Sequence, residues 1–466
     1  MCIVKASSIS SPSQSEVMAN LSVKKVEVCR VAPKPGSPEN QSLPLTFFDL
    51  LWLRFQPVER LFFYQTSSTD SVLSKLKTSL SLTLQHFLPL AGNLTWPQDS
   101  LKPVLSYVQG DAVSLTVAES DVDFDHLINS IFLPAQDFSP LVPQLDVTDE
   151  RAAAMALQIT VYPNHGFSIG TTTHHAILDG KTWTSFVKAW AHICKYEEAQ
   201  ALPSSLVPFY DRRVVKDPSG LGELYSRQHQ NKDGRTDNRS LSIASISKDR
   251  KAPDREDSIR GTFEFTRAFI QTLRAHVTSK MASDSSLHLS TFSLVSAYTW
   301  VCMVKAEEIK GEKTALIIGA DSRSRLDPPI PATYFGNCIV GRVAVAETKG
   351  LLGEDGLVVA VSAITEAVRS LEKGLLDGAE NWVSKFLDFS LYGRTYSIAG
   401  SHRFEVYDTD FGWRRPKRVE VISIDKTGAI SLSDSKNGGG GVEVGLVLKK
   451  QYAEAFDALF ASLVLH

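Results

Sequence analysis

The stretch TTHHAILDG, residues 172–180, decides how the rest of this chain is interpreted. It places His175 four residues before Asp179, and Gly180 follows directly. The same His-x-x-x-Asp-Gly spacing recurs in HQNKDG, residues 229–234. The chain has 466 residues and 11 histidines. A pair with this spacing then arises by chance roughly 0.7 times, so the spacing alone proves nothing.

The neighbouring sequence separates the two copies. Predicted strands at residues 154–162 and 166–173 lead into the first copy, and the segment KTWTSFVKAWAHICKYEE after it has apolar residues at helical spacing. His175 therefore lies at a strand-to-helix junction, where rigid backbone can hold a side chain against a cavity. The second copy falls in residues 222–257, which are polar and lack an apolar period, so we interpret them as a mobile linker with His229 in solvent.

Composition excludes several classes of protein. With 43% hydrophobic and 22% charged residues, the chain resembles an ordinary soluble protein, and a net charge of −3 argues against a nucleic-acid partner. No apolar run reaches the roughly 18 residues that span a bilayer, and the first residues lack a signal-peptide core, so we expect a cytoplasmic protein without a membrane partner. The 5 scattered cysteines, without a C-x-x-C pair, predict reduced thiols and no metal site.

Alternating strand and helix signals predict an α+β fold. We expect a disordered Ser-rich tail over residues 1–22, an N-terminal domain over 23–210, a crossover linker over 211–257 and a C-terminal domain over 258–466. Both domains mix strands with helices, so a groove between them is the expected place for a ligand.

Six motifs, in their order along the chain, resemble those of the plant BAHD acyl-CoA-dependent acyltransferases. They are LPLTFFDLLWLRF (43–55), LQHFLPLAGNL (84–94), HHAILDG (174–180), FYDRRVVKDP (209–218), DSRSRLDPPIPATYFGNC (321–338) and YDTDFGWRRPKRVEV (407–421). Each motif is weak, but the ordered series covers nearly the whole chain. A narrower resemblance is to the clade of anthocyanin and flavonoid, or phenolic, glucoside malonyltransferases. It is carried by the segments YFGNC, HHAILDGKT and KAWAHIC.

This resemblance implies two similar domains of chloramphenicol-acetyltransferase type, with a solvent channel between them and His175 at its centre. It makes His175 the general base, and chemistry supports that choice, because a neutral imidazole with pKa near 6.5 is suited to removing a hydroxyl proton. The CoA thiolate leaves readily, so no covalent intermediate with the enzyme is required. Acyl-CoA would be a co-substrate, and no cofactor would be bound permanently.

Asp179 has two candidate roles. It can orient His175, or it can pair with Arg323 or Arg325 and hold the loop rigid, which is the role that the family suggests. His174 is expected to be a packing neighbour. The family motifs also include Gly180 and Asn337, and Cys338 is expected to be a buried thiol rather than a nucleophile.

The second family motif, Asp410, Phe411, Gly412 and Trp413, is expected to shape the channel on the CoA side, with Asp410 as a supporting catalytic acid in the alternative. Arg414 stands where the family usually has glycine. If that position has a positive φ, an arginine there costs on the order of 1 kcal/mol.

Two further groups of residues are candidate binding positions. Ser290, Thr291, Arg414 and Arg415 are assigned to the CoA side, where the arginines would attract phosphates. A solvated surface is the equal alternative for this basic cluster. Gly400 and Ser401 are assigned to the acceptor side, because related enzymes with aromatic acyl donors carry a bulky segment there and small residues leave room for a glycoside.

The sequence therefore predicts an enzyme that transfers a malonyl group from malonyl-CoA to a sugar hydroxyl, at the 6-position, of a phenolic, flavonoid or anthocyanin glucoside. A hydroxycinnamoyl-CoA donor on a similar glycoside is the first alternative. The second is a non-catalytic binder of phenolics with the same fold. We expect a monomer whose partners are the acyl-CoA and the glycoside.

Overall fold

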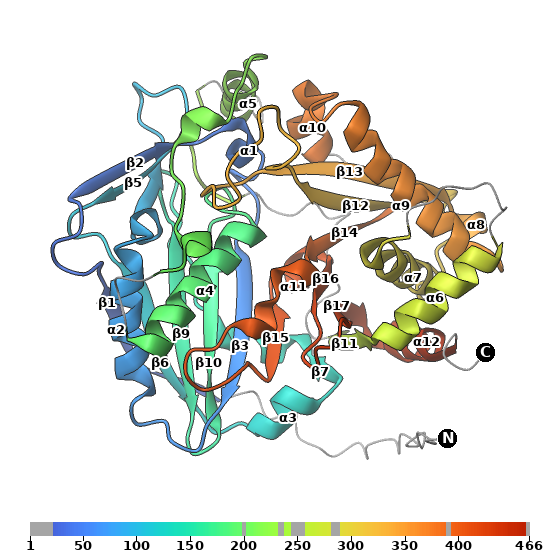
Figure 1. Cartoon of the computed structure of the whole chain (residues 1–466), viewed down its shortest axis with the longest axis horizontal. Helices are drawn as coiled ribbons and strands as arrows, with labels where there is room; N and C mark the ends of the chain where they lie inside the picture. The colour runs from blue at the N-terminus through green and yellow to red at the C-terminus, as the bar shows by residue number, and fades with distance from the viewer. Residues whose placement is uncertain are drawn as a thin grey trace.

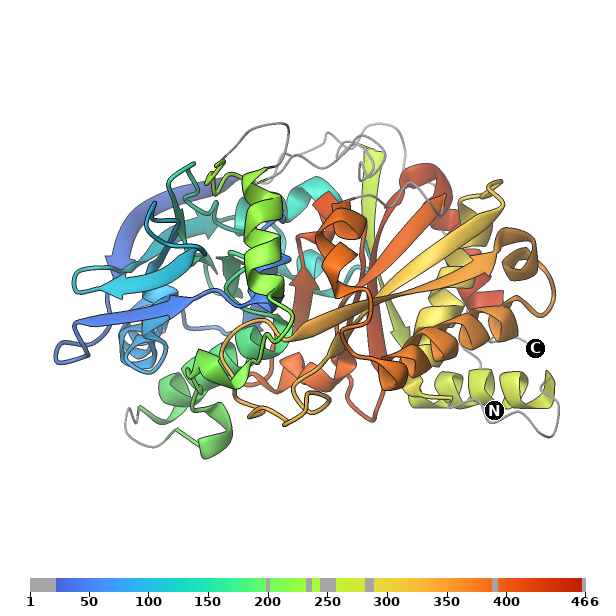
Figure 2. The same cartoon turned by 90° about the horizontal axis from the view of Figure 1, so that it is seen from above.

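The computed structural model describes residues 22–197, 202–231, 237–243, 257–280, 289–387 and 393–462. Strands and helices are mixed throughout these ranges, which confirms the α+β class. The predicted tail, up to residue 21, and much of the predicted linker, residues 244–256, lie outside the described residues. Two lobes stand side by side, the first half of the chain in one and most of the second half in the other (Figure 2).

A six-stranded sheet forms the centre of the first lobe. Its strands, in spatial order, are β1 (Val23–Val31), β6 (Val113–Ser120), β9 (Met155–Tyr162), β10 (Gly166–Thr173), β3 (Val58–Gln65) and β15 (Arg418–Val421). Helices α2 (Val72–Leu84) and α4 (Gly180–Tyr196) lie against one another and against this sheet (Figure 1). The strands predicted on either side of residue 164 are β9 and β10, and they pair as an antiparallel hairpin.

A small four-stranded sheet and several short helices complete this lobe. The small sheet has the order β2 (Asn40–Pro44), β5 (Val104–Val108), β4 (Asn93–Thr95) and β8 (Arg151–Ala153). The short helices are α1 (Phe47–Leu50), α3 (Phe124–Asn129) and α5 (Leu221–Gln230).

A seven-stranded sheet forms the second lobe. Its order is β13 (Ile339–Glu347), β12 (Lys313–Asp321), β14 (Arg394–Gly400), β16 (Ile430–Asp434), β17 (Val442–Lys449), β11 (Ser258–Phe265) and β7 (Phe132–Pro134). The helices of this half are α6 (Arg267–Lys280), α7 (Thr291–Ala306), α8 (Thr348–Leu352), α9 (Gly356–Lys373), α10 (Trp382–Leu387), α11 (Ile424–Thr427) and α12 (Lys450–Ser462). Among all helices that the structure describes, none has the length and apolar character needed to cross a bilayer.

The two lobes exchange strands. β15, from late in the chain, pairs with β3 in the first sheet, and β7, from early in the chain, pairs with β11 in the second. Figure 1 shows both strands beside their partners from the other half. Each of the two large sheets therefore contains strands from both sides of the expected division at residues 211–257.

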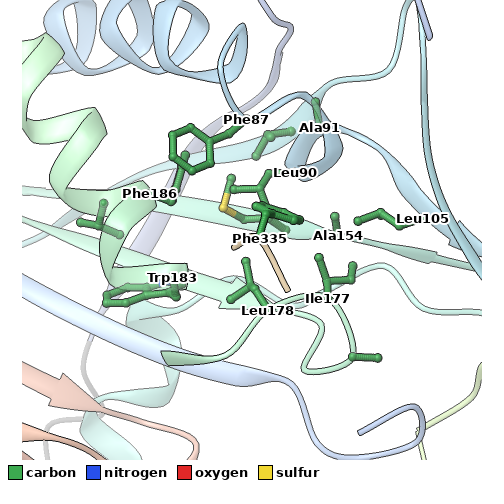
Figure 3. Packing of buried hydrophobic residues seen from close by; sticks show 14 of the residues in the cluster. Phe87, Leu90, Ala91, Leu105, Ala154, Ile177, Leu178, Trp183, Phe186 and Phe335 are labelled. Atoms are coloured by element: carbon green, nitrogen blue, oxygen red, sulfur yellow. The ribbon is translucent and has the colours of Figure 1, made fainter. Parts of the chain in front are cut away.

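The loop between β10 and α4, residues 174–180, is called the His loop below. Ile177 and Leu178 in its middle are buried and point into the core of the first lobe, together with Leu90, Leu105 and Phe335 (Figure 3). Burying two large apolar side chains contributes roughly 1.5 to 3 kcal/mol each, so the middle of the His loop is firmly attached to the core.

The predicted linker contains an unexpected helix. α5 occupies residues 221–230, and Leu221, Tyr225 and His229 form a buried stripe along it at a spacing of four residues. The hydroxyl of Tyr225 donates to the carbonyl of Ala379, and Nε2 of His229 lies 2.8 Å from the carbonyl oxygen of Leu50. The expectation that His229 is solvated and its segment mobile is therefore wrong, because three residues with the right spacing suffice to bury one face of a polar helix.

Replacing His229 with alanine should lower the free energy of unfolding by about 1 to 3 kcal/mol, because the substitution leaves the buried carbonyl of Leu50 without this contact and opens a small cavity. Urea denaturation followed by circular dichroism measures the change. His165→Ala, at an exposed hairpin turn, is the matched control and should change stability by less than about 0.5 kcal/mol. Equal effects of the two substitutions would contradict the burial of His229.

Candidate active site

The imidazole of His175 is held between aromatic rings from the start of the chain. The ring of Trp52 stacks on it with centroids 3.9 Å apart and an angle of 4° between the planes. The ring of Phe55 meets it edge-on at 5.4 Å. From the second half of the chain, Nδ2 of Asn337 donates a hydrogen bond of 3.0 Å to the backbone carbonyl of His175. The ring plane and the backbone of His175 are thus positioned by different parts of the fold.

His175 is neutral at physiological pH. Burial lowers its pKa to about 4, and the positive charge of Arg60 adds to this lowering while Asp179 opposes it. Nδ1 is buried and has no hydrogen-bond partner within the described ranges. Since the side chain as a whole is partly exposed, Nε2 is the ring nitrogen available to another molecule. A neutral imidazole with an accessible nitrogen can accept a proton.

Both carboxylate oxygens of Asp179 are used within the protein. Oδ1 accepts from the backbone N–H of Thr182 at 2.9 Å and caps the N-terminus of α4. Oδ2 accepts from Nη1 of Arg323 at 2.8 Å and from the N–H of Cys338 at 3.1 Å. Of the two candidate roles, the geometry fits the one that holds the loop, and the partner is Arg323. Arg325 instead donates to a backbone carbonyl of its own loop.

Arg323 connects the His loop to the second half of the chain. It is buried, and its Nη2 donates to the hydroxyl of Thr182 and to the carbonyls of Tyr334 and Gly336, at 3.0, 3.1 and 3.0 Å. The segment YFGNC, residues 334–338, is therefore bound to the N-terminus of α4 by one guanidinium group. Asn337, which holds the backbone of His175, lies in that segment.

Asp49 is a site residue that the sequence interpretation missed. It is completely buried, and its Oδ1 accepts from both the backbone N–H and the side-chain amide of Asn337, at 2.8 and 3.1 Å. Its Oδ2 accepts from the N–H of Thr46 and from Nη1 of Arg212. Asp49 thus fixes the amide that holds His175. A lone acid inside the apolar run TFFDLLWL was the available signal, because such an acid is buried only when its oxygens are satisfied.

Gly180, His174 and Cys338 have structural positions. A Cβ atom at Gly180 would lie 2.7 Å from the ring of Phe404 and 3.1 Å from Nη2 of Arg60, so only glycine fits there. His174 is completely buried, and its Nδ1 accepts from the N–H of Ala176 at 3.2 Å. Burial raises the pKa of the Cys338 thiol to about 12, which leaves it protonated and a poor nucleophile.

Asp410 lies at the opposite end of α4 from His175. Its Oδ2 accepts from Nζ of Lys195 at 2.8 Å, and its Oδ1 accepts from the N–H of Gly412. Lys195 is separated from Asp179 by almost the full length of α4, which corresponds to about 24 Å at 1.5 Å per residue. The alternative in which Asp410 is a supporting catalytic acid is therefore corrected, since no proton passes directly between groups so far apart.

The aromatic residues of the DFGW motif attach this part of the chain to the first lobe. The ring of Phe411 packs edge-on against Tyr64 and Trp190, with centroid distances of 5.6 and 4.9 Å. The ring of Trp413 packs against Phe167 at 5.1 Å. The motif thus secures the segment that leads into β15.

The residues assigned to the CoA side have different structural roles. Ser290 caps α7, accepting from the N–H of Ser293 at 3.0 Å, and Thr291 is the first helical residue. Arg414 has φ of 71°. Arg415 donates to the carboxylate of Asp408 and to a backbone carbonyl, so its charge is already paired within the protein.

The residues assigned to the acceptor side, Gly400 and Ser401, have structural roles in the backbone turn that they form. Gly400 has φ of 87°, and a Cβ atom there would lie 2.6 Å from the carbonyl oxygen of Leu432. The hydroxyl of Ser401 accepts from the N–H of Arg403 and begins the short turn that carries Phe404 to Gly180. Both residues therefore support a segment that touches the His loop.

A surface hollow of about 580 Å³ lies in the second lobe, lined by residues of α6, β13 and α9 that include Lys280, Val345 and Val359. It contains none of the predicted site residues, and a channel through His175 stays a prediction. In the part of the chain that the structure describes, no three histidine, cysteine or acidic side chains are grouped as metal ligands.

Arg414→Gly should raise the free energy of unfolding by about 0.5 to 1 kcal/mol. An L-residue in the left-handed region is strained by about 1 to 2 kcal/mol, and the extra unfolded-state freedom of glycine offsets part of the relief. Thermal and urea unfolding measure the change. Arg415→Gly is the matched control: it removes two hydrogen bonds at a residue without a positive φ and should destabilise the protein. A loss of stability in Arg414→Gly would refute the strain argument.

Known proteins match this chain along almost its whole length. Residues 21–462 match the model of the Transferase family. The chain is 41% identical over 450 residues to phenolic glucoside malonyltransferase 2 of Arabidopsis thaliana, covering 93% of this chain and 98% of that protein. It is 42% identical over 468 residues to the malonyl-CoA:anthocyanidin 5-O-glucoside-6''-O-malonyltransferase of the same plant, with coverages of 95% and 98%.

Two further proteins show how broad the similarity is. Agmatine coumaroyltransferase of Arabidopsis thaliana is 37% identical over 453 residues, covering 94% of this chain and 99% of that protein. The fold is similar to the crystal structure of vinorine synthase, with a TM-score of 0.66, 21% identity and coverages of 95% and 98%. Because the family model spans nearly the whole sequence and the relatives match along almost their full length, the chain belongs to the Transferase family, the BAHD acyl-CoA-dependent acyltransferases.

Proposed function

We propose that this protein transfers a malonyl group from malonyl-CoA to a sugar hydroxyl of a phenolic, flavonoid or anthocyanin glucoside, with His175 as the general base. The observation that carries the proposal is the neutral imidazole of His175, held in place by Trp52 and Asn337 with Nε2 left available. The choice of substrates is supported by the relatives named as malonyltransferases of such glucosides.

The reaction needs one base and no covalent intermediate with the protein. Nε2 of His175 accepts the proton of the sugar hydroxyl as its oxygen attacks the thioester carbon. The C–S bond of the tetrahedral intermediate then breaks, the carbonyl forms again, and the departing CoA thiolate takes the proton from the imidazolium. The products are the malonate ester and free CoA, and His175 returns to its neutral form.

Asp179 and Asp49 act in this scheme as positioning residues. Asp179 fixes the end of the His loop through α4 and Arg323, and Asp49 fixes the backbone of His175 through Asn337. Neither carboxylate is hydrogen-bonded to the imidazole. The position of the base is therefore set by its backbone and by the ring of Trp52, and not by a triad of the serine-protease type.

Binding positions for the two substrates complete the proposal. Ser290, Thr291 and Arg414 belong to the CoA side, where Arg415 contributes less because Asp408 pairs with it. The segment from Gly400 to Phe404 belongs to the acceptor side, supported by its contact with Gly180. We further propose that the protein acts as a monomer in the cytosol, which size-exclusion chromatography with light scattering and imaging of a tagged protein would check.

An aromatic acyl donor is the second candidate, because agmatine coumaroyltransferase is 37% identical to this chain. Sequence identity to members of the family therefore does not by itself identify the acyl donor. A non-catalytic binding function is disfavoured, since a binder has no need of a base whose carbonyl, ring plane and loop are each fixed separately.

His175→Ala should reduce turnover by about 100- to 10,000-fold, the usual contribution of a general base, while the protein stays folded. The measurement is release of free CoA from malonyl-, acetyl- and coumaroyl-CoA with a panel of phenolic glucosides. His165→Ala, at the exposed hairpin turn, serves as the control and should retain full activity. If the unmodified protein releases no CoA with any pair, the enzyme proposal is wrong, and if only coumaroyl-CoA is used, the aromatic alternative replaces malonyl-CoA.

The pH dependence should reflect the lowered pKa of His175. Because burial moves that pKa to about 4, the base stays neutral from pH 8 down to about pH 5, and kcat/KM should fall only below that, without a step near 6.5. Stability should already fall between about pH 6.5 and pH 4, because the unfolded chain protonates its histidines near pH 6.5 while the folded His174 and His175 stay neutral until about pH 4.

Initial rates between pH 4.5 and 8 check this expectation. Samples held at each pH and assayed again at pH 7.5 separate reversible titration from unfolding. A reversible fall in kcat/KM centred near pH 6.5 would show that His175 titrates as it does in solvent.

A further inference from the structure

Arg60 is a buried cation that has no carboxylate partner in the described part of the chain. It lies on β3, between β10 and β15, in register with Thr171 and Val421. Its side chain is 6% exposed, and its guanidinium lies over the ring of Trp183, 4.2 Å from the centroid. Within the described part of the chain, no acceptor atom is hydrogen-bonded to it, and its Nε is buried without a partner.

The guanidinium lies beside the end of the His loop. Its Nη2 lies 3.1 Å from the place of a Cβ atom at Gly180, so it sits at the N-terminus of α4 beside the His loop. Its charge acts on both functional residues of that loop: it lowers the pKa of His175, and it is attracted by Asp179. Unlike Nε, the two Nη atoms are not enclosed by protein atoms, so they can reach another molecule.

Four other arginines with buried guanidinium groups differ from Arg60 in having carboxylate partners. Arg212 pairs with Asp49 and Arg323 with Asp179 and Asp321. Arg260 and Arg418 pair with Glu420, the former also with Asp425. Each of these cations faces a carboxylate, as buried charges in proteins generally do.

Asp179 does not compensate Arg60. Its two oxygens already accept from Thr182, Arg323 and Cys338. Burial lowers the pKa of Arg60 to about 10, which still leaves it positively charged at neutral pH. An unpaired charge in such a place is unfavourable for stability, and groups with a pKa perturbed in this way cluster at functional sites.

The position decides which anion fits. The phosphates of CoA are separated from its thioester by the long pantetheine arm, so they cannot lie beside His175 while the thioester does. The free carboxylate of a malonyl group is one carbon away from the thioester carbonyl and must lie close to the base. A guanidinium binds a carboxylate with two parallel hydrogen bonds, which also fixes its orientation.

We propose that Arg60 binds the free carboxylate of the malonyl group and selects this donor over acyl-CoA molecules with a neutral acyl group. The inference rests on the proposed function, whose donor it specifies. The bound carboxylate offsets the charge of Arg60, and this removes an unfavourable field from the imidazolium of His175 that forms during the reaction. Arg60 thus contributes to donor choice and to the environment of the base through one ion pair.

Arg60→Met tests the proposal, because methionine keeps much of the volume over Trp183 and removes the charge. The value of kcat/KM should fall about 100-fold for malonyl-CoA, as for loss of a charged bidentate contact, and about 3-fold or less for acetyl-CoA with the same glucoside. Arg60→Lys keeps the charge without the fork and should give an intermediate malonyl-to-acetyl ratio. Arg227→Met, at a side chain that is 69% exposed on α5, is the control and should leave the ratio unchanged.

The outcomes separate the two proposals. If the unmodified enzyme transfers malonyl groups and Arg60→Met lowers both donors equally, Arg60 is only a packing residue and this inference fails while the proposed function stands. If the unmodified enzyme does not use malonyl-CoA, both fail. Circular dichroism and thermal unfolding verify that the variants fold, and if Arg60→Met does not, the donor ratio of Arg60→Lys decides the question in the same way.

Discussion

The ion pair between Asp179 and Arg323 is the interaction on which the rest of the site depends. One partner ends the His loop and caps α4, and the other follows β12 and binds the carbonyls of the YFGNC segment. Breaking a buried pair of this kind leaves a charge without compensation and costs about 3 to 5 kcal/mol. Since the partners come from different halves of the chain, one contact both joins these halves and fixes the end of the loop that carries His175.

Around this pair a connected hydrogen-bond network links the two halves of the chain. Asp49 accepts hydrogen bonds from Thr46, Arg212 and Asn337. The side-chain amide of Asn337 also donates to the backbone carbonyl of His175. Such networks specify a single arrangement, because a shift of any member leaves another buried polar group unpaired. Two groups at the His loop have properties suited to substrate: the imidazole of His175 is neutral, and the guanidinium of Arg60 has no hydrogen-bonded carboxylate in the described part of the chain.

Short-range patterns in the sequence carried much of the prediction. The junction of strand and helix at His175 and the cap at Ser290 follow from residues within a few positions of each other. The positions of Asp49 and Arg60 do not, because the contacts of Asp49 with Arg212 and Asn337 and of Arg60 with Trp183 join residues more than a hundred positions apart, and no local period shows which groups meet. His229 was misplaced for a different reason: the few apolar residues of α5 form one narrow stripe, which a polar composition conceals.

The exchange of strands between the lobes has a consequence for how this architecture can be taken apart. A chain cut in the middle yields two fragments, each of which carries an edge strand of the other's sheet: β7 remains with the first fragment and β15 with the second. Neither fragment can form its complete sheet alone. Each fragment supplies the strand that the other one lacks, so the two lobes are expected to fold together as one unit.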